Sequence, residues 1–176
     1  MATWVALLRG INVGRHNRLP MGELRPMLES LGYDDVRTHL QSGNALFTAT
    51  GKAVMIEQAI SRRVKRETGL GIKVLVRTSK ELDAVIAANP FTKRRVPAKE
   101  LHVAFLSGAP SRAKLGKVDP ASYAPDEVEM GKRALYLRLP KGWSGSNLPN
   151  VEKLVGLDAT VRTWRTVTRL AELAHG

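Results

Sequence analysis

Short apolar runs alternate with helical patterns along the first half of the chain. The runs predict strands at residues 3–9, 36–40, 45–48 and 72–77. Apolar side chains recur on one face over residues 20–31 and 52–68, which predicts helices with Gly32 and Gly69 just past their ends. Pro26 lies inside the first helix and predicts a kink or a late helix start. The predicted order is β-α-β-β-α-β.

The second half predicts the same order after a connecting helix at residues 79–88. Asn89-Pro90 should break that helix, and residues 92–99 should form an exposed basic loop. Strands are then expected at 101–106, 127–130, 134–139 and 160–162, and helices at 111–117, 150–155 and 164–174. The two halves show no obvious residue identity, so the repeat lies in the pattern alone.

These patterns predict an α+β fold made of two successive ferredoxin-like βαββαβ subdomains with mainly antiparallel sheets, plus a C-terminal helix. The subdomains are expected at residues 1–78 and 79–176, packed as one globular unit, and 176 residues are enough to build a sizeable core. In this arrangement the first strand and the following hairpin reach the same sheet edge. The loop at 10–19 and the turns at 41–44 and 69–71 should therefore lie together.

The segment from Arg9 to Arg18, Arg-Gly-Ile-Asn-Val-Gly-Arg-His-Asn-Arg, is the main candidate for function. It makes a strand-to-helix connection of about ten residues, whereas such connections usually take 2–6, and loops of unusual length are often functional. It also leads into a helix N-terminus, where backbone N–H groups favour anions. The alternative is a solvated loop that its glycines merely allow to turn. It lacks the Gly-Lys-Ser/Thr end of a Walker loop and the G-x-G-x-x-G spacing.

An anionic ligand at this loop would use several groups at once. The arginines of the loop would pair with the negative charge of the ligand, and its glycines would let the backbone approach a phosphate or carboxylate. Asn12 and Asn44 would fix the orientation of the ligand. Arg162 and Trp164 would join if the two halves pack with these ends together. The candidate ligand-binding residues are Arg9, Gly10, Asn12, Gly14, Arg15, His16, Arg18, Ser42, Asn44, Arg162 and Trp164.

The net charge of +12 fits either a polyanion-binding surface or a generally basic proteome. Residues 1–80 hold 13 basic and 6 acidic side chains and residues 81–176 hold 15 and 10, so the positive excess is spread along the chain.

The absence of cysteine excludes disulfides and thiolate metal sites, and the four histidines have no metal-ligand spacing. The chain shows no signal peptide and no apolar run long enough to cross a membrane. We therefore expect a cytoplasmic protein with no cofactor and no membrane partner.

Several segments together resemble the bacterial family known as domain of unknown function 1697. They are Ala6–Gly14, Leu31-Gly-Tyr33, Val36-Arg-Thr38, Gln41-Ser-Gly-Asn44, His102–Leu106, Leu135-Tyr-Leu137 and Thr160–Val167. The resemblance covers nearly the whole chain and implies an α+β fold with two related subdomains. It implies no activity.

Two segments depart from the pattern of that family. Arg15 stands where the family often has a second glycine, and Arg162-Thr-Trp-Arg-Thr166 stands where it often has Arg-Asn-Trp-Asn-Thr.

Three functions stay open: a binding protein for nucleic acid, a nucleotide or a phosphorylated metabolite; an enzyme with His16 as general acid or base; and a protein-interaction role without ligand. The sequence does not indicate an oligomeric state.

Overall fold

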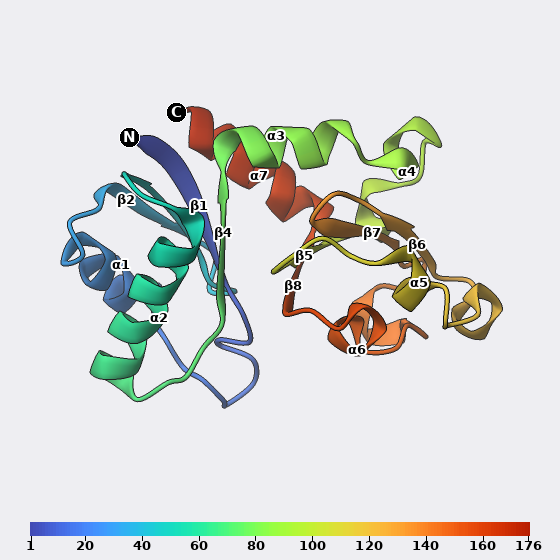
Figure 1. Ribbon diagram of the computed structural model, residues 1–176, viewed down its shortest axis with the longest axis horizontal. Coiled ribbons are helices and arrows are strands. Elements are labelled where there is room, and N and C mark those ends of the chain that lie inside the picture. Colours follow the sequence, from blue (N-terminus) through green and yellow to red (C-terminus); the bar gives the residue numbers. More distant parts are fainter. The chain divides into compact units, whose positions relative to one another are not determined.

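The computed structural model describes residues 1–176 and divides into two compact units (Figure 1). Unit 1 comprises Met1–Leu82 together with Leu170–Gly176, and unit 2 comprises Asp83–Arg169. The helices α3 (Ser79–Ala87) and α7 (Trp164–His175) each contribute residues to both units. The expected boundary after residue 78 stays a prediction.

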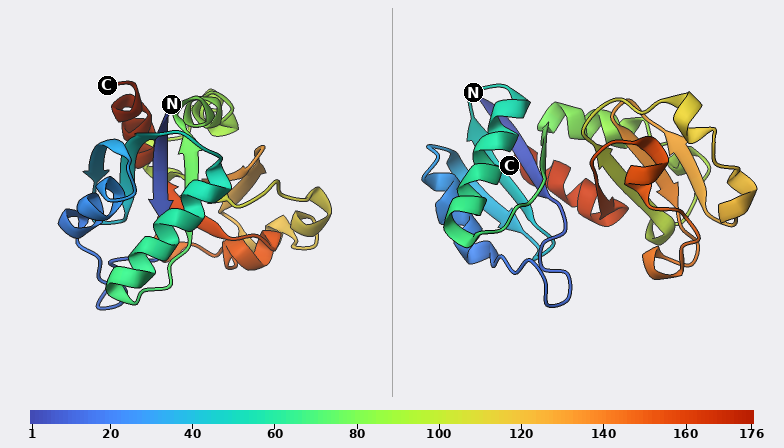
Figure 2. Two further views of the ribbon diagram at one scale, coloured as in Figure 1. Left: turned by 60° about the vertical axis from the view of Figure 1, so that its left-hand side comes forward. Right: turned by 60° about the horizontal axis from the view of Figure 1, so that its bottom comes forward.

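Unit 1 is built on a four-stranded antiparallel sheet with the order β2-β3-β1-β4. Its elements are β1 (Ala2–Leu8), α1 (Met21–Glu29), β2 (Asp34–His39), β3 (Asn44–Ala49), α2 (Ala53–Thr68) and β4 (Val74–Thr78). Both helices cover one face of the sheet (Figure 2), which follows from the alternation of inward and outward side chains along the strands. Trp4, Ala6 and Leu8 point to that face and are buried in one core with Leu24 of α1 and Ile60 of α2.

Unit 2 has a second four-stranded antiparallel sheet, with the order β6-β7-β5-β8. Its elements are α4 (Pro90–Lys93), β5 (Leu101–Leu106), α5 (Arg112–Leu115), β6 (Glu127–Met130), β7 (Ala134–Arg138), α6 (Val151–Val155) and β8 (Ala159–Thr163), with 3-10 turns at Ala98–Glu100, Pro120–Tyr123 and Trp143–Gly145. One sheet face packs against α6, where Ala104, Leu106 and Leu135 meet Leu154. The chain is thus α+β with two antiparallel sheets and seven helices, and the pattern of apolar runs predicts the fold class and all the helices except α4.

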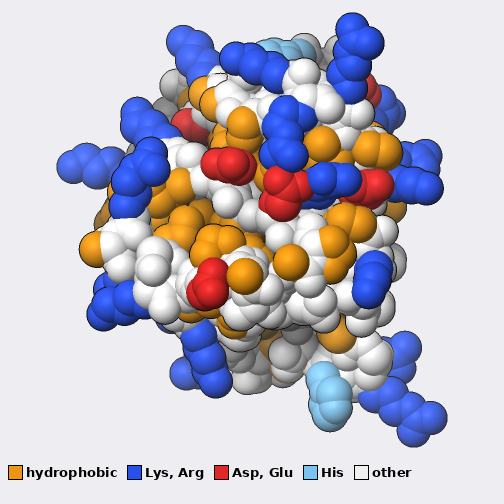
Figure 3. Space-filling model, turned by 90° about the vertical axis from the view of Figure 1, so that its right-hand side faces the viewer, with side chains coloured by type: hydrophobic (Ala, Val, Ile, Leu, Met, Phe, Trp, Pro, Cys, Tyr) orange, Lys and Arg blue, Asp and Glu red, His pale blue; other side chains and the backbone are white.

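Charged side chains of both signs lie on the face of unit 2 that Figure 3 shows, with lysines and arginines at its rim. Arg138 contacts the carboxylates of Glu100 at 3.0 Å and Glu127 at 2.7 Å, and Arg94 contacts Glu127 at 2.9 Å. Part of the positive charge of this unit is therefore neutralised within the molecule.

The two halves share a residue motif that the sequence pattern did not reveal. Val76-Arg77-Thr78 ends β4 and Val161-Arg162-Thr163 ends β8. Arg77 pairs with Val5 in the first sheet, and Arg162 pairs with Val103 in the second. In each motif the buried guanidinium donates from Nη1 to the carbonyl of the preceding valine, at 2.8 Å and 2.9 Å. The expectation that the repeat lies in pattern alone is wrong.

Two predicted details of secondary structure are wrong in part. The helix α1 begins at Met21 and continues through Pro26 to Glu29, so it does not start late, and the alternative of a kink at Pro26 stays a prediction. Residues 92–99 are expected to form a loop, yet the first two of them belong to the helical turn Pro90–Lys93. Asn89 caps that turn by accepting a hydrogen bond from Phe91 N at 3.0 Å, and Pro90 fits its first position because proline has no N–H to satisfy.

Candidate functional site

The loop between β1 and α1 folds into a small hairpin. Val13 and His16 form an isolated antiparallel bridge, and Asn12 N donates to Asn17 O at 3.0 Å. Asn12 and Asn17 both have left-handed backbone, with φ of 54° and 49°, a conformation that asparagine tolerates better than most residues. The six residues from Val13 to Arg18 are all exposed, so the tip projects from the sheet edge into solvent.

Asn12 fastens the base of this hairpin to the rest of unit 1. Its Oδ1 accepts from Leu19 N at 2.8 Å, and its Nδ2 donates to Leu19 O at 2.8 Å and to Gln41 O at 2.7 Å. Asn17 Nδ2 adds a bond to Gly10 O at 3.0 Å. The side chain of Asn12 is therefore used to hold the loop, whereas we expected it to orient a ligand.

The turn between β2 and β3 packs directly against the loop, as the sheet geometry predicts. Leu8 N donates to Gly43 O at 2.8 Å. Gly43 has φ of 88°, and a Cβ there would lie 2.6 Å from Ile11 Cδ1, so glycine is required for this close approach. Asn44 is fully buried, and its Nδ2 donates to His39 O at 2.8 Å and to Ser42 Oγ at 3.1 Å.

The segment after the Gly69–Gly71 turn reaches the same edge. Arg9 N donates to Lys73 O at 2.9 Å, which brings an exposed lysine beside the start of the loop. Sequence reasoning missed Lys73 as a candidate, although its place just after a turn expected at this edge was a usable signal. The predicted meeting of the three connections is confirmed.

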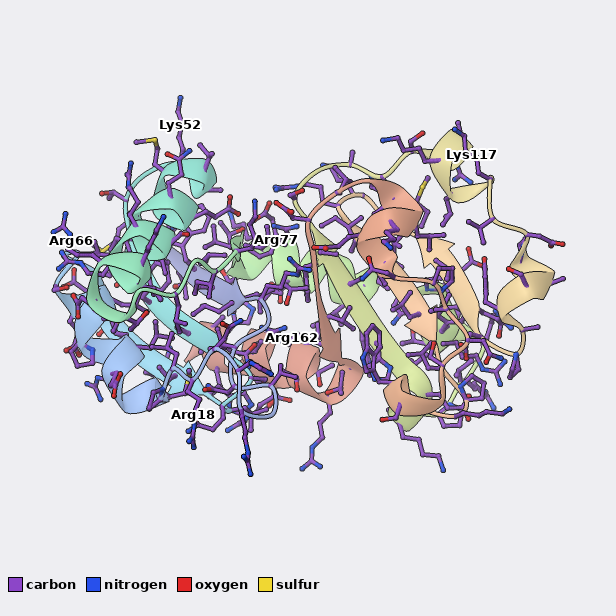
Figure 4. All side chains as sticks on the ribbon, turned by 90° about the horizontal axis from the view of Figure 1, so that it is seen from below. Arg18, Lys52, Arg66, Arg77, Lys117 and Arg162 are labelled. Atoms are coloured by element: carbon purple, nitrogen blue, oxygen red, sulfur yellow. The ribbon has the colours of Figure 1, made fainter.

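Positive charge gathers on the exposed part of this edge. The stretch from Arg9 to Arg18 contains three arginines and a histidine but no acidic residue, and Arg15, His16 and Arg18 are exposed. Figure 4 shows Arg18 pointing away from the body of unit 1. Gly10 and Gly14 have φ of 65° and 59°, and no heavy atom lies within 4 Å of the place a Cβ would take. The backbone there is open to a ligand.

Arg162 and Trp164 belong to unit 2 and are both buried. Arg162 Nη1 also donates to Thr160 Oγ1 at 2.7 Å, and burial lowers the pKa of its guanidinium to about 10. Their part in a ligand site together with the loop stays a prediction.

Two broader features of the chain limit the chemistry to consider. No group of three or more histidine, aspartate or glutamate side chains is arranged to hold a metal ion. None of the helices combines the length and apolar character needed to cross a membrane.

The chain resembles a solved structure over its whole length. The conserved bacterial protein SP0830 from Streptococcus pneumoniae superposes with a TM-score of 0.78 at 19% sequence identity, with 98% of each chain covered. At this identity the likeness concerns the fold alone. No curated protein is similar enough in sequence to be matched.

The sequence profile described as "Protein of unknown function (DUF1697)" matches residues 1–136. That region includes the β1–α1 loop and the Gln41–Asn44 turn, whereas the similar run at Thr160–Val167 lies beyond it. Because the match spans more than three quarters of the 176 residues, the chain belongs to the DUF1697 family of proteins of unknown function.

Proposed function

We propose that this protein binds an extended polyanion, with nucleic acid as the ligand class, through the Arg9–Arg18 loop. The observation that carries the proposal is the exposed hairpin tip, on which Arg15, His16 and Arg18 project with no acidic residue in the same stretch. Arginine suits phosphate because its planar guanidinium can donate two parallel hydrogen bonds.

The shape of this edge favours a polymer over a small phosphorylated molecule. Small ligands are usually held in pockets that bury most of their surface. The tip is exposed from Val13 to Arg18, and the space around Gly10 and Gly14 is open. A strand of nucleic acid can make several phosphate contacts along such an open surface, and each contact releases bound counterions.

The hydrogen bonds at the base of the hairpin support this proposal by reducing the entropic cost of binding. Asn12 ties the loop to Leu19 and Gln41, and Asn17 ties it to Gly10. A loop already held in shape loses less conformational freedom when a ligand binds. In this proposal Asn12 positions the loop, and the arginines and Lys73 contact phosphate.

The test is a titration of fluorescently labelled single-stranded RNA and duplex DNA at several salt concentrations. We expect the affinity of the Arg15→Gln/Arg18→Gln variant to fall. The slope of log K against log[salt] should decrease by about 1.4 for the single strand or about 1.8 for the duplex, since two phosphate contacts are lost. The control is Arg112→Gln/Lys132→Gln, which removes the same charge from exposed positions of unit 2. Equal slopes for the two variants, or no binding by the native protein at low salt, would refute the proposal.

We also propose that each half is a ferredoxin-like unit. The support is the matching element order β-α-β-β-α-β and the matching strand orders β2-β3-β1-β4 and β6-β7-β5-β8. Comparing each half separately with solved ferredoxin-like domains would test this. A superposition that requires a different strand order in either half would contradict it.

A further inference from the structure

A surface groove of about 910 Å³ lies in unit 1 at the opposite end of the sheet from the Arg9–Arg18 loop. Thr3, near the start of β1, lines it, whereas the loop follows the last residue of β1, Leu8. Its walls come from the outer side of α1, from the start of β2 and from the last residues of α7. All of these residues belong to unit 1.

The groove is slightly acidic, with the three carboxylates of Glu29, Asp34 and Asp35 against two arginines, although the chain as a whole carries a charge of +12. Arg25 is paired with an acid, since its Nε contacts Glu29 Oε1 at 2.9 Å. Arg37 keeps its positive charge, but its Nη2 is held at the end of α7 by donating to Leu173 O at 2.8 Å. Asp34 and Asp35 are exposed and have no ion pair; Asp35 Oδ2 accepts a hydrogen bond only from Thr48 Oγ1, at 3.4 Å. Two carboxylates therefore remain for an incoming cation.

An aromatic surface lies beside these carboxylates. The ring of Tyr33 stacks on that of Phe47, with centroids 4.6 Å apart and planes 8° from parallel, and both residues line the groove. Phe47 is buried and holds one face of the tyrosine ring, while Tyr33 itself is only half-buried. A fixed aromatic ring next to carboxylates suits a guanidinium, which can stack on the ring and also pair with an acid.

We propose that this groove docks an arginine-rich, extended segment of a partner protein. Charge complementarity identifies the occupant, because Asp34 and Asp35 attract cations and repel phosphate. The open shape of the groove favours a segment of a larger molecule, since a small amine would keep too much of its surface in water. The site is separate from the proposed nucleic-acid surface and takes a ligand of opposite charge.

The probe is a fluorescein-labelled peptide in which arginines alternate with glycines, followed by fluorescence anisotropy. We expect Asp34→Asn/Asp35→Asn to weaken binding roughly five- to tenfold, as for two exposed charge pairs. Asp35 has φ of 51°, which asparagine also tolerates, so this variant should fold. A lysine version of the peptide should bind several-fold more weakly, because an ammonium cannot stack on Tyr33 as a guanidinium does.

The matched control is Glu23→Gln/Glu129→Gln, which removes two exposed carboxylates that do not line the groove. An equal loss in both double variants would overturn the proposal in favour of general electrostatic attraction. Spermidine that binds as tightly as the peptide would overturn it in favour of a small-amine site. Self-association of the native protein without peptide that Asp34→Asn/Asp35→Asn abolishes, measured by analytical ultracentrifugation, would overturn it in favour of a second copy of this chain. The Arg15→Gln/Arg18→Gln variant should bind the peptide normally, so failure here is distinguishable from failure of the proposed function.

Discussion

Replacing Asn12 by alanine removes three hydrogen bonds between its side chain and the backbone of Leu19 and Gln41. The free energy of unfolding should fall by about 1–3 kcal/mol, because buried Leu19 would lose partners for both its N–H and its carbonyl. Asn17→Ala is a matched control, since Asn17 has a similar φ but makes a single bond, to Gly10 O. Urea denaturation of both variants checks this, and equal losses would show that the bonds of Asn12 do not matter.

His102 should make stability depend on pH. Its Nδ1 is buried without a hydrogen-bond partner, and burial lowers the pKa of the imidazole although a hydrogen bond with the Glu100 backbone acts in the opposite direction. The folded state therefore favours neutral His102, while an unfolded histidine takes up a proton near pH 6.5. Above that pH both states are neutral, and as pH falls below it the unfolded chain binds more protons, so stability is lost.

Urea denaturation at pH 7.5 and pH 5 measures this effect. The native protein should lose stability at the lower pH, and His102→Gln should lose less. His16→Gln should keep the full loss, because His16 is exposed at the loop tip. A His102→Gln variant that loses as much stability as the native protein would exclude His102 as the cause.

At the scale of elements, the repeated threonines Thr78 and Thr163 directly precede α3 and α7 and cap their N-termini. Thr78 Oγ1 accepts a hydrogen bond from Glu81 N at 3.2 Å, and Glu81 Oε2 accepts one from Thr78 N at 2.8 Å. Thr163 Oγ1 accepts from Thr166 N at 3.3 Å. Thr78→Val and Thr163→Val should each lower the free energy of unfolding by about 1 kcal/mol, the usual effect of losing an N-cap. Thr168→Val is the control, because its hydroxyl bonds only to carbonyls within α7; a loss as large as that of Thr163→Val would refute the capping role.

Elements that bury long apolar runs were predictable, and elements that depend on caps were less so. The strand at 101–106 was placed at its observed bounds because all six residues are buried. Gly69 was correctly expected to end α2, where its φ of 76° closes the helix. The helical turn at Pro90–Lys93 was missed because Asn-Pro also suits a helix start, and one side-chain hydrogen bond decides between the two outcomes.

At the scale of the whole molecule, the predicted topology was enough to place the loop at 10–19 and the turns at 41–44 and 69–71 at one sheet edge. The role of Asn12 was not predictable, because it depends on which backbone groups its amide meets after folding. The groove at the other end of the sheet was also hidden, since it joins Asp34 and Asp35 to residues near position 175. The net charge did not locate either surface, because the excess divides into +5 for unit 1 and +7 for unit 2.

The last turn of α7 has a consequence for synthesis on the ribosome. Unit 1 includes Leu170–Gly176, with the Leu173 carbonyl to which Arg37 donates and the residues that complete the groove. These residues are translated after the whole of unit 2, roughly 4 to 17 s later at common elongation rates. During that interval the nascent first half lacks one wall of its groove. Chaperones that shield exposed nascent segments would therefore meet unit 1 in an unfinished form until residues 170–176 have been synthesised.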